Sequence, residues 1–430
     1  MTGSLLQLVA IGNEDMYITG NPQISFFKAA YKRYTNFAYE NINVNFNGSS
    51  NLNERTPIKI YATLPKYGDL ISNINFEIDI PEIYTVKSFS WISNLGIQII
   101  NYVRIYIGDR LIEELDADYI ITYYKATLGN EKHGILDKMI GNTPDMVRSL
   151  TDITSPLYKG SSKNSSDTNK FGIPSSPYKR LSIPIPFWFS KYSGLEIPLI
   201  SLFNTPVKIE IELKSKNQLF YLIKDIKPDL SDITEIQSLS NWNLKPILDI
   251  KYIYLSNEEK QLIKNYEHYY LIERLQKKEF LGNIGQQILS LEFFNPIKVM
   301  YIIPKKNTAD EINDFSNYTD ESTNIIKNLE IKFNGSVRLG MKDYDYFNKI
   351  QPYIHHTNKL PEGVLMYSFS INPEEYQPSG WCNFTNFRKI ELDVQYKDPS
   401  SDYKYNTSVY CVSYNILKIE KGECNLLFAT

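Results

Sequence analysis

Hydrophobic and polar residues alternate along many short stretches of this chain. In residues 41–47, Ile42, Val44 and Phe46 are separated by asparagines. The same period of two recurs in residues 74–80, 207–213, 327–333 and 389–394. Because successive side chains of a strand point to opposite faces, this period predicts half-buried β-strands with one polar face. Clusters of Pro, Gly, Asn and Ser separate the stretches, which favours antiparallel sandwiches or barrels.

Helical patterns are few. The stretch that begins at Ser256 has Glu259 three residues on, which is the capping-box pattern. A second candidate helix starts near Asp116 or Asp118 and ends at Gly129. The sequence therefore predicts a mainly β protein with a few short helices in its connections.

The aromatic segment 21–40 predicts a third helix, close to the start of the chain. Asn21 followed by Pro22 is a plausible helix start. Four aromatic residues recur at helical spacing and form one apolar face: Phe26, Phe27, Tyr31 and Tyr34. Such a segment could lie on a membrane surface, dock on a partner, or cover the core of its own protein.

Two parts of the chain share one pattern. Residues 105–119 contain a strand, a Gly108-Asp109 turn, and then Asp118-Tyr119. Residues 331–346 contain a strand, an Asn334-Gly335 turn, and then Asp345-Tyr346. Both turns favour hairpins. The repeat predicts two tandem copies of one β-domain.

The breaks in the pattern suggest where these copies lie. Residues 153–179 and 304–324 are polar, and we expect them to be exposed loops in the first and second copy. The polar stretch 216–244 is the expected connection between the copies. The first domain would then end at residue 215, and the second would span 245–430.

Composition narrows the classes of function. The 430 residues carry a net charge of −3, so no bulk positive field favours nucleic acid as a direct partner. Three cysteines without CxxC spacing argue against a disulfide scaffold and against a zinc site, and a reducing compartment fits best. We expect no secretory signal, and no apolar run reaches the length of about 18 residues that a membrane-spanning helix needs.

Catalytic and metal-binding patterns are scarce, so we expect no enzyme, no cofactor and no metal. His355 and His356 are adjacent, and neighbours along a strand point to opposite faces, which disfavours a shared metal site. His133 and His268 have no partner at ligand spacing, and Cys382 has no nucleophile signature. Two carboxylates could still converge in space, as glycoside hydrolysis requires.

Sequons for N-glycosylation occur six times, and coincidence explains most of them in an asparagine-rich chain. Only Asn164 and Asn317 lie in the long polar loops, so they are the two candidate modification sites.

Several longer stretches together resemble the major capsid proteins of nucleocytoplasmic large DNA viruses. The resemblance covers most of the chain in the family's order, and its blocks are residues 8–40, 103–120, 183–213, 252–276, 350–384 and 414–430. The most recognisable block is "IQPYIHHTNKLPEGVLMYSFSINPEEYQPSGWCNF". Asn295 and Trp381 depart from the family pattern, where a His and a small residue are usual.

The resemblance implies a double jelly roll, that is, two tandem eight-stranded antiparallel barrels. It implies a structural role in the virion: three copies would form a pseudo-hexagonal capsomer that tiles an icosahedral shell. Residues 1–24 would be an arm on the inner side of the shell, so that the first jelly roll spans 25–215. The aromatic residues Phe26, Phe27, Tyr31 and Tyr34 would then pack at the base of the first barrel or against a neighbouring component.

The implied partners are other copies of the chain and minor capsid proteins, with room for indirect contact with an internal membrane. Assembly would take place in the host cytoplasm. One alternative is a minor capsid or assembly-scaffold protein of the same fold. A more remote one is a carbohydrate-binding or carbohydrate-active β-sandwich, because 13% of the residues are aromatic and could include sugar-stacking side chains.

Overall fold

The computed structural model describes residues 2–29, 31–85, 88–150, 152, 155–159, 172–222, 228, 242–400 and 402–428. The chain divides into two units, Met1–Asn36 and Phe37–Thr430. The first unit extends further along the chain than the arm that was expected over residues 1–24. Each unit is described by itself.

The N-terminal unit contains two short helices, α1 (Gly3–Val9) and α2 (Asn13–Thr19). The helix expected in segment 21–40 is wrong: no described residue between Gly20 and Asn36 is helical, and Asn21 has a φ of +50°. The physical reason is that a short helix gains most of its stability by packing its apolar face. Here the face is not buried, because all four aromatic side chains are exposed: Phe26, Phe27, Tyr31 and Tyr34.

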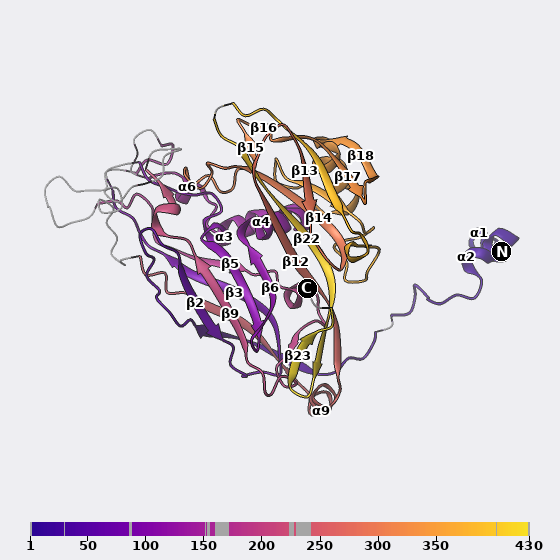
Figure 1. The fold of residues 1–430 in the computed structure, drawn as a ribbon. Helices are drawn as coiled ribbons and strands as arrows, with labels where there is room; N and C mark the ends of the chain where they lie inside the picture. The colour runs from indigo at the N-terminus through magenta and orange to yellow at the C-terminus, as the bar shows by residue number, and fades with distance from the viewer. Residues whose placement is uncertain are drawn as a thin grey trace. The chain divides into compact units, whose positions relative to one another are not determined.

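The second unit begins with eight main strands that form two four-stranded antiparallel sheets (Figure 1). In the order in which neighbours pair, the first sheet is β1 (Phe37–Asn45), β11 (Ile247–Leu255), β3 (Leu70–Ile80) and β7 (Lys179–Pro184). The second is β2 (Ile58–Thr63), β9 (Val207–Leu213), β5 (Ile100–Ile107) and β6 (Arg110–Asp116). Minor strands are β4 (Ser90–Trp91), β8 (Ile197–Pro198) and β10 (Phe220–Tyr221).

The next eight main strands repeat this order. One sheet is β12 (His268–Asn283), β22 (Tyr405–Glu420), β14 (Pro296–Lys306) and β19 (Leu365–Ser368). The other is β13 (Gln286–Leu291), β21 (Ile390–Tyr396), β17 (Ile326–Phe333) and β18 (Ser336–Asp343). When the eight main strands of each set are numbered in chain order, the pairing order is 1-8-3-6 in one sheet and 2-7-4-5 in the other, and it is the same in both sets. This is the double jelly roll, as predicted.

Short elements fill the connections. The helices are α3 (Leu95–Gln98), α4 (Ala117–Thr127), α5 (Asn130–Met139), α6 (Pro144–Val147), α7 (Trp188–Lys191), η1 (Lys216–Gln218), α9 (Asn257–Asn265), η2 (Tyr346–Ile350), α10 (Gln351–His355) and η3 (Phe384–Asn386). The short strands are β15 (Thr319–Asp320), β16 (Thr323–Asn324), β20 (Cys382–Asn383) and β23 (Glu423–Leu426). The two helices with capping signals form as expected, and the hydroxyl of Ser256 accepts a hydrogen bond from the Glu259 amide of α9.

The first roll ends later than the sequence suggested. Strand β11 pairs along its length with β1 and with β3, so residues 247–255 complete the first roll. The polar stretch 216–244 therefore connects β9 to β11 within that roll, and much of it lies outside the described residues. The link between the rolls is α9. A polar break between strands has the same composition within a roll as between rolls, so the sequence could not separate the two cases.

One sheet of the second roll is buried on both faces. Met300 of β14 and Val409 of β22 face the core of the second roll. Tyr301 and Tyr410, their neighbours along the same strands, pack with the core of the first roll. Successive strand residues point to opposite faces, so this sheet is the layer that joins the two rolls.

Candidate functional site

The region that joins the two rolls, called the seam here, collects buried charged side chains. On the side of the first roll it consists of β6, α4 and α7; on the side of the second roll it consists of β12, β22 and β14. Figure 1 shows α4 and β6 beside this sheet. Two clusters of charge lie in the seam.

The first cluster surrounds Glu273 on β12. Its carboxylate accepts a hydrogen bond from Lys191 of α7 at 3.1 Å and another from Lys298 of β14. All three side chains are buried. Burial alone would raise the pKa of Glu273, but the adjacent charges of Lys298 and Lys191 lower that pKa to about 2. Glu273 is therefore a carboxylate that bridges the two rolls.

Glu113 of β6 lies beside this cluster. Its side chain is 3% exposed, and its Oε2 has no hydrogen-bond partner among the described residues. Burial raises the pKa of Glu113 to about 7, against the opposing effect of Lys191 and of the Trp188 backbone. The seam thus contains one carboxyl group that titrates near neutral pH.

The second cluster surrounds Asp116 and Asp118, at the junction of β6 and α4. The carboxylate of Asp116 accepts from Lys277 at 2.9 Å and from the Tyr410 hydroxyl at 2.7 Å. Asp118 accepts from Lys305 at 2.8 Å. Every one of these contacts crosses from the first roll to the second.

The segment between β14 and β15 adds a third set of contacts across the seam, and this corrects the expectation that residues 304–324 form an exposed loop. Phe315 and Tyr318 are buried, and the Tyr318 hydroxyl donates to Asp118 at 3.1 Å. Aromatic side chains inside the polar stretch give the loop an apolar anchor. The sequence already contained them, but composition alone did not show what they would pack against.

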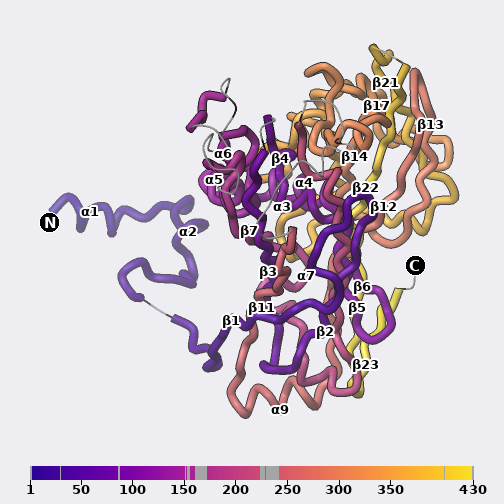
Figure 2. The backbone as a smooth tube through the Cα atoms, turned by 90° about the vertical axis from the view of Figure 1, so that its left-hand side faces the viewer, coloured from indigo at the N-terminus to yellow at the C-terminus, as the bar shows by residue number. Residues whose placement is uncertain are grey.

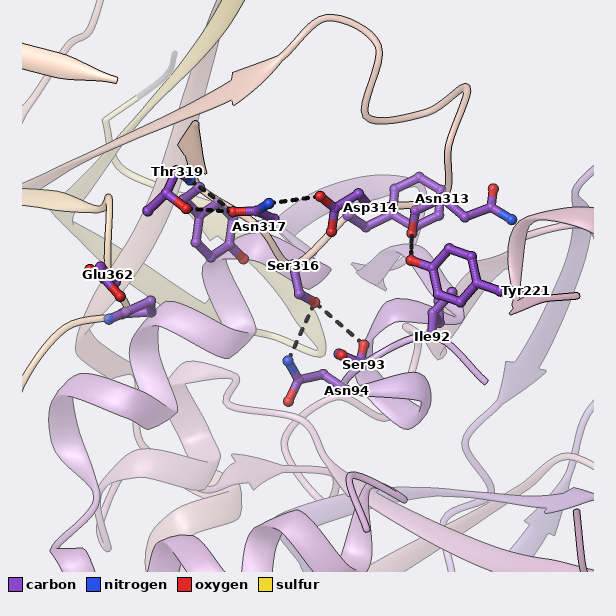
Figure 3. Close-up of a pocket in the computed structure, with 13 residues that line it drawn as sticks. Ile92, Ser93, Asn94, Tyr221, Asn313, Asp314, Ser316, Asn317, Thr319 and Glu362 are labelled. Carbon is purple, nitrogen blue, oxygen red and sulfur yellow. Dashed lines mark hydrogen bonds between the residues drawn. The ribbon is translucent and has the colours of Figure 1, made fainter. Parts of the chain in front are cut away.

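A small hollow of ≈ 370 Å³ lies over this segment (Figure 3). Ser316 accepts a hydrogen bond from the Asn94 side chain at 3.3 Å, and the Tyr221 hydroxyl donates to the Asn313 carbonyl at 2.7 Å. Figure 3 shows these polar groups bonded to one another across the hollow. These contacts in the described lining therefore help to hold the two rolls together.

Of the two candidate glycosylation sites, only Asn317 lies among the described residues. Asn164 lies outside the described residues. Asn317 borders the hollow, where its amide donates to Asp314 at 2.7 Å and its carbonyl accepts from the Thr319 backbone at 3.0 Å. Attachment of a glycan to Asn317 would have to break the bond to Asp314, and its modification stays a prediction.

The histidines have individual polar partners. His356 contacts Glu374 at 2.7 Å and Tyr301 at 2.9 Å, so it also supports the seam. His355 contacts the Ile371 carbonyl at 2.8 Å. His355 is the last residue of the helix α10 and His356 follows it, so neither lies on a strand, which corrects the geometry assumed for them. Among the described residues no three His, Cys, Asp or Glu side chains are grouped to hold a metal, and the three cysteines are free thiols.

Sequence reasoning missed the seam residues. Lys298 is a charged residue within an otherwise apolar strand pattern, which is the signal that could have marked it, whereas Glu113 and Glu273 have charged neighbours in the sequence and carry no such signal. Asp118 belongs to the repeated pattern, and Asp116 and Asp118 are both candidate helix starts, but neither pattern indicates a partner in the second roll. Among the described helices, none is long and apolar enough to cross a membrane.

Comparison with known proteins agrees with this architecture. The family described as "Major capsid protein N-terminus" matches residues 25–256, and the family described as "Large eukaryotic DNA virus major capsid protein" matches residues 259–424. The border between the two matches coincides with the change of sheet after Leu255.

Two relatives are similar over nearly the full length of both chains. The chain is 27% identical to the major capsid protein of Phaeocystis pouchetii virus, with 100% of both chains covered. It is 26% identical to the probable capsid protein 4 of Acanthamoeba polyphaga mimivirus, over 97% of this chain and 98% of that protein.

Solved structures share the fold. The crystal structure of PBCV-1 VP54, fitted into a reconstruction of the virophage Sputnik, superposes with a TM-score of 0.74 at 23% identity; 94% of this chain and 100% of that chain are covered. The Faustovirus major capsid protein superposes with a TM-score of 0.73 at 13% identity, over 95% of this chain and 94% of that chain. The chain therefore belongs to the major capsid proteins of large eukaryotic DNA viruses, which are structural and not enzymatic components of the virion capsid.

Proposed function

We propose that three copies of this chain form a pseudo-hexagonal capsomer, and that capsomers tile the outer shell of an icosahedral particle. The observation that carries the proposal is the repeated strand order: each chain contains two rolls of one topology. Three chains then supply six similar rolls. A three-fold axis closes the oligomer, and six similar blocks approximate the six-fold shape that tiles a surface.

The seam supports the proposal in a second way. Tiling requires that the two rolls of a chain keep a fixed relative orientation. A hinge between them would allow the shape of the capsomer to vary. Buried ion pairs that cross between the rolls provide such a constraint, since breaking one leaves an unpaired charge away from water. Glu273 makes a buried pair of this kind, and Asp116 and Asp118 make pairs across the same seam that are only partly buried.

Electron microscopy of the purified protein tests the capsomer. We expect particles with a three-fold axis and a hexagonal outline. Particles of a single chain, without hexagonal assemblies at any concentration, would contradict it. Shells in which this chain occupies only isolated positions would instead support the minor capsid alternative, which the similarity to the mimivirus probable capsid protein 4 keeps open.

The N-terminal unit is proposed to act on the inner side of the shell. Its exposed aromatic residues Phe26, Phe27, Tyr31 and Tyr34 would pack at the base of the first roll or against minor capsid proteins. Contact with an internal membrane would be indirect, nucleic acid would not be contacted, and assembly would occur in the host cytoplasm. Deletion of residues 1–24 should impair shell formation more than folding of the rolls; normal shells from the deleted chain would contradict this role.

The carbohydrate alternative is less well supported. Many of the large aromatic side chains are core residues that cannot stack on sugars, including Trp91, Trp188 and Phe187. A glycan array and a panel of glycoside hydrolase substrates, both without signal, would remove this alternative.

A further inference from the structure

Four lysine side chains border one small cavity in the seam, beside Asp116 and Asp118. The cavity has a volume of ≈ 200 Å³ and lies where β6 and β9 end, next to the end of β14 and the start of β22. Its wall also includes Gln98 of α3, a helix that lies against α4 on the side of the first roll near β14 and β22 (Figure 2). The lysines are Lys214, Lys277, Lys305 and Lys306.

Lys214 differs from the other three lysines in its partners. The ammonium groups of Lys277, Lys305 and Lys306 each lie within 2.9 Å of a carboxylate oxygen. Lys214 is only 7% exposed, and it forms no ion pair with any residue that the structure describes. Its Nζ donates instead to the backbone carbonyl of Gln98 at 2.7 Å and to the side-chain oxygen of Gln98 at 3.1 Å.

This position makes Lys214 easy to deprotonate. Burial lowers the pKa of Lys214 to about 8, and the nearby charge of Lys305 lowers it further. The carboxylates that face the amine oppose this shift without cancelling it, and they are Asp118, Asp310 and Asp116. With such a pKa, about a tenth of the amine is uncharged at pH 7, against less than about one part in a thousand for an ordinary lysine.

An uncharged lysine amine is a nucleophile, and a small reagent can reach this one from solvent. The wall near the amine is buried, whereas the rim of the cavity is exposed and consists of Lys277, Glu279, Asn307 and Asp310. A water molecule takes up about 30 Å³ in the liquid, so the cavity has room for a group as small as acetyl. The other three lysines of the cavity are held by their carboxylates in the charged form, which does not react.

We propose that Lys214 is a site of covalent acylation, at which a small acyl phosphate transfers its acyl group to Nζ. The lone pair of the uncharged amine forms a bond with the acyl carbon, and the bond between that carbon and the phosphate oxygen breaks. The phosphate leaves with the electron pair, and Nζ releases one proton to solvent. The product is a neutral amide. This modification does not depend on the proposed capsomer.

Acylation of Lys214 would weaken one part of the seam. The ammonium lies 4.3 Å from the centre of the Phe315 ring, and buried Phe315 anchors the segment between β14 and β15. An amide has no charge to attract the ring. Its single N–H also replaces three ammonium donors, so one of the two bonds to Gln98 is lost. Because the Gln98 amide donates to Ser316 at 3.1 Å, the modification would loosen this segment from the first roll.

Competitive labelling of the full-length protein tests the site. The protein is treated with a trace of acetyl phosphate, and peptide mass spectrometry measures the rate of acetylation at each lysine between about pH 6 and pH 10. Lys421, whose side chain is 87% exposed, is the control for free access, and Lys305 is the control for entry into the cavity.

We expect Lys214 to react at least about tenfold faster than Lys421 at pH 7, and its rate to level off above a midpoint near pH 8, whereas an ordinary lysine gains reactivity up to about pH 10. Lys305 should react far more slowly than Lys214. If Lys214 stays unmodified where Lys421 reacts, or if its midpoint is no lower than that of Lys421, the assignment of the site is wrong.

Two variants test the effect on the seam. Lys214→Gln removes the charge, as acylation does, and Lys214→Arg keeps it. Hydrogen exchange of residues 307–320 should be several-fold faster in Lys214→Gln and in the acetylated wild type, and close to the wild-type rate in Lys214→Arg. Lys421→Gln is the matched control, since Lys421 lies outside the lining of the cavity.

The acetylated wild type keeps the test valid even where Lys214→Gln fails to fold, because it is modified after folding. Faster exchange in residues 307–320 on acetylation of Lys214, and none on acetylation of Lys421, supports the link to the seam. Unchanged exchange after acetylation of Lys214 would overturn that link.

Discussion

Glu273 illustrates what a single residue contributes to the seam. Its carboxylate lies between Lys191 and Lys298, which come from different rolls and are both buried. Replacing a buried ion pair as a whole can be neutral, but removing one partner leaves an uncompensated charge away from water. In Glu273→Gln two buried ammonium groups lose their carboxylate.

We expect Glu273→Gln to lower the free energy of unfolding by about 3–5 kcal/mol. The matched control is Asp345→Asn, which removes the exposed pair between Asp345 and Lys349 at 2.9 Å. Exposed pairs contribute about 0–1 kcal/mol because water screens them. Urea-induced unfolding of both variants measures the difference, and equal effects would contradict the role given to Glu273.

Glu113 predicts a dependence of stability on pH. The pKa of its carboxyl is raised to about 7 by burial, above the value of 4.5 for an exposed glutamate. The folded state therefore binds this proton more tightly than the unfolded state does. The resulting stabilisation is complete below pH 4.5 and is lost as the pH rises through 7, by about 3 kcal/mol in total.

In Glu113→Gln this contribution is absent, so the variant should lose less stability than the wild type as the pH rises from about 5 to about 8. The measurement is the melting temperature of both proteins across this range. Lys191, Glu273 and Arg274 act on Glu113 electrostatically and are present in both proteins, so the difference isolates Glu113. A difference that does not change with pH would contradict a pKa of about 7 for Glu113.

At the scale of elements, the strands with alternating residues were predictable because one face of each packs on a core. The residues that alternate in 74–80 and 207–213 form β3 and β9, and the repeated hairpins are β5–β6 and β17–β18. The helix predicted in segment 21–40 is absent, because an amphipathic face forms a stable helix only when something covers it, and the spacing alone does not show a cover. The prediction of an exposed loop before β15 was wrong for a related reason, because the residues that cover this loop lie in the other roll.

A turn in the second roll supports the seam through the loop that contains Tyr318. Gly363 has a φ of +88°, and a Cβ at this position would lie 2.0 Å from the Tyr318 carbonyl oxygen. Gly335 also has a positive φ, +82°, but a Cβ there would meet nothing within 4 Å.

We expect Gly335→Ala to cost about 1–2 kcal/mol, which is the strain of a left-handed backbone. Gly363→Ala should cost clearly more, because the loop with Tyr318 must move and weaken the bond to Asp118. Thermal unfolding of the two variants compares these costs. If both lose the same stability, the close approach of Gly363 to the Tyr318 carbonyl does not constrain the seam.

At the scale of the molecule, the sequence was sufficient to predict the duplicated domain and the family, because both predictions rest on patterns that extend over most of the chain. The charged residues of the seam were harder to predict from the sequence. Glu113, Glu273 and Lys298 lie far apart in sequence, and only the folded chain shows that they share one buried cluster. The end of the first roll was misplaced for the same reason, since only strand pairing shows that β11 returns between β1 and β3.

The two rolls and their seam lead to one claim about the whole molecule, which is that three copies form the building block of a capsid. The mass of the purified protein under native conditions tests this claim most directly. We predict a species of three times the mass of the chain, which persists on dilution. A protein that remains a monomer at every concentration would contradict the account.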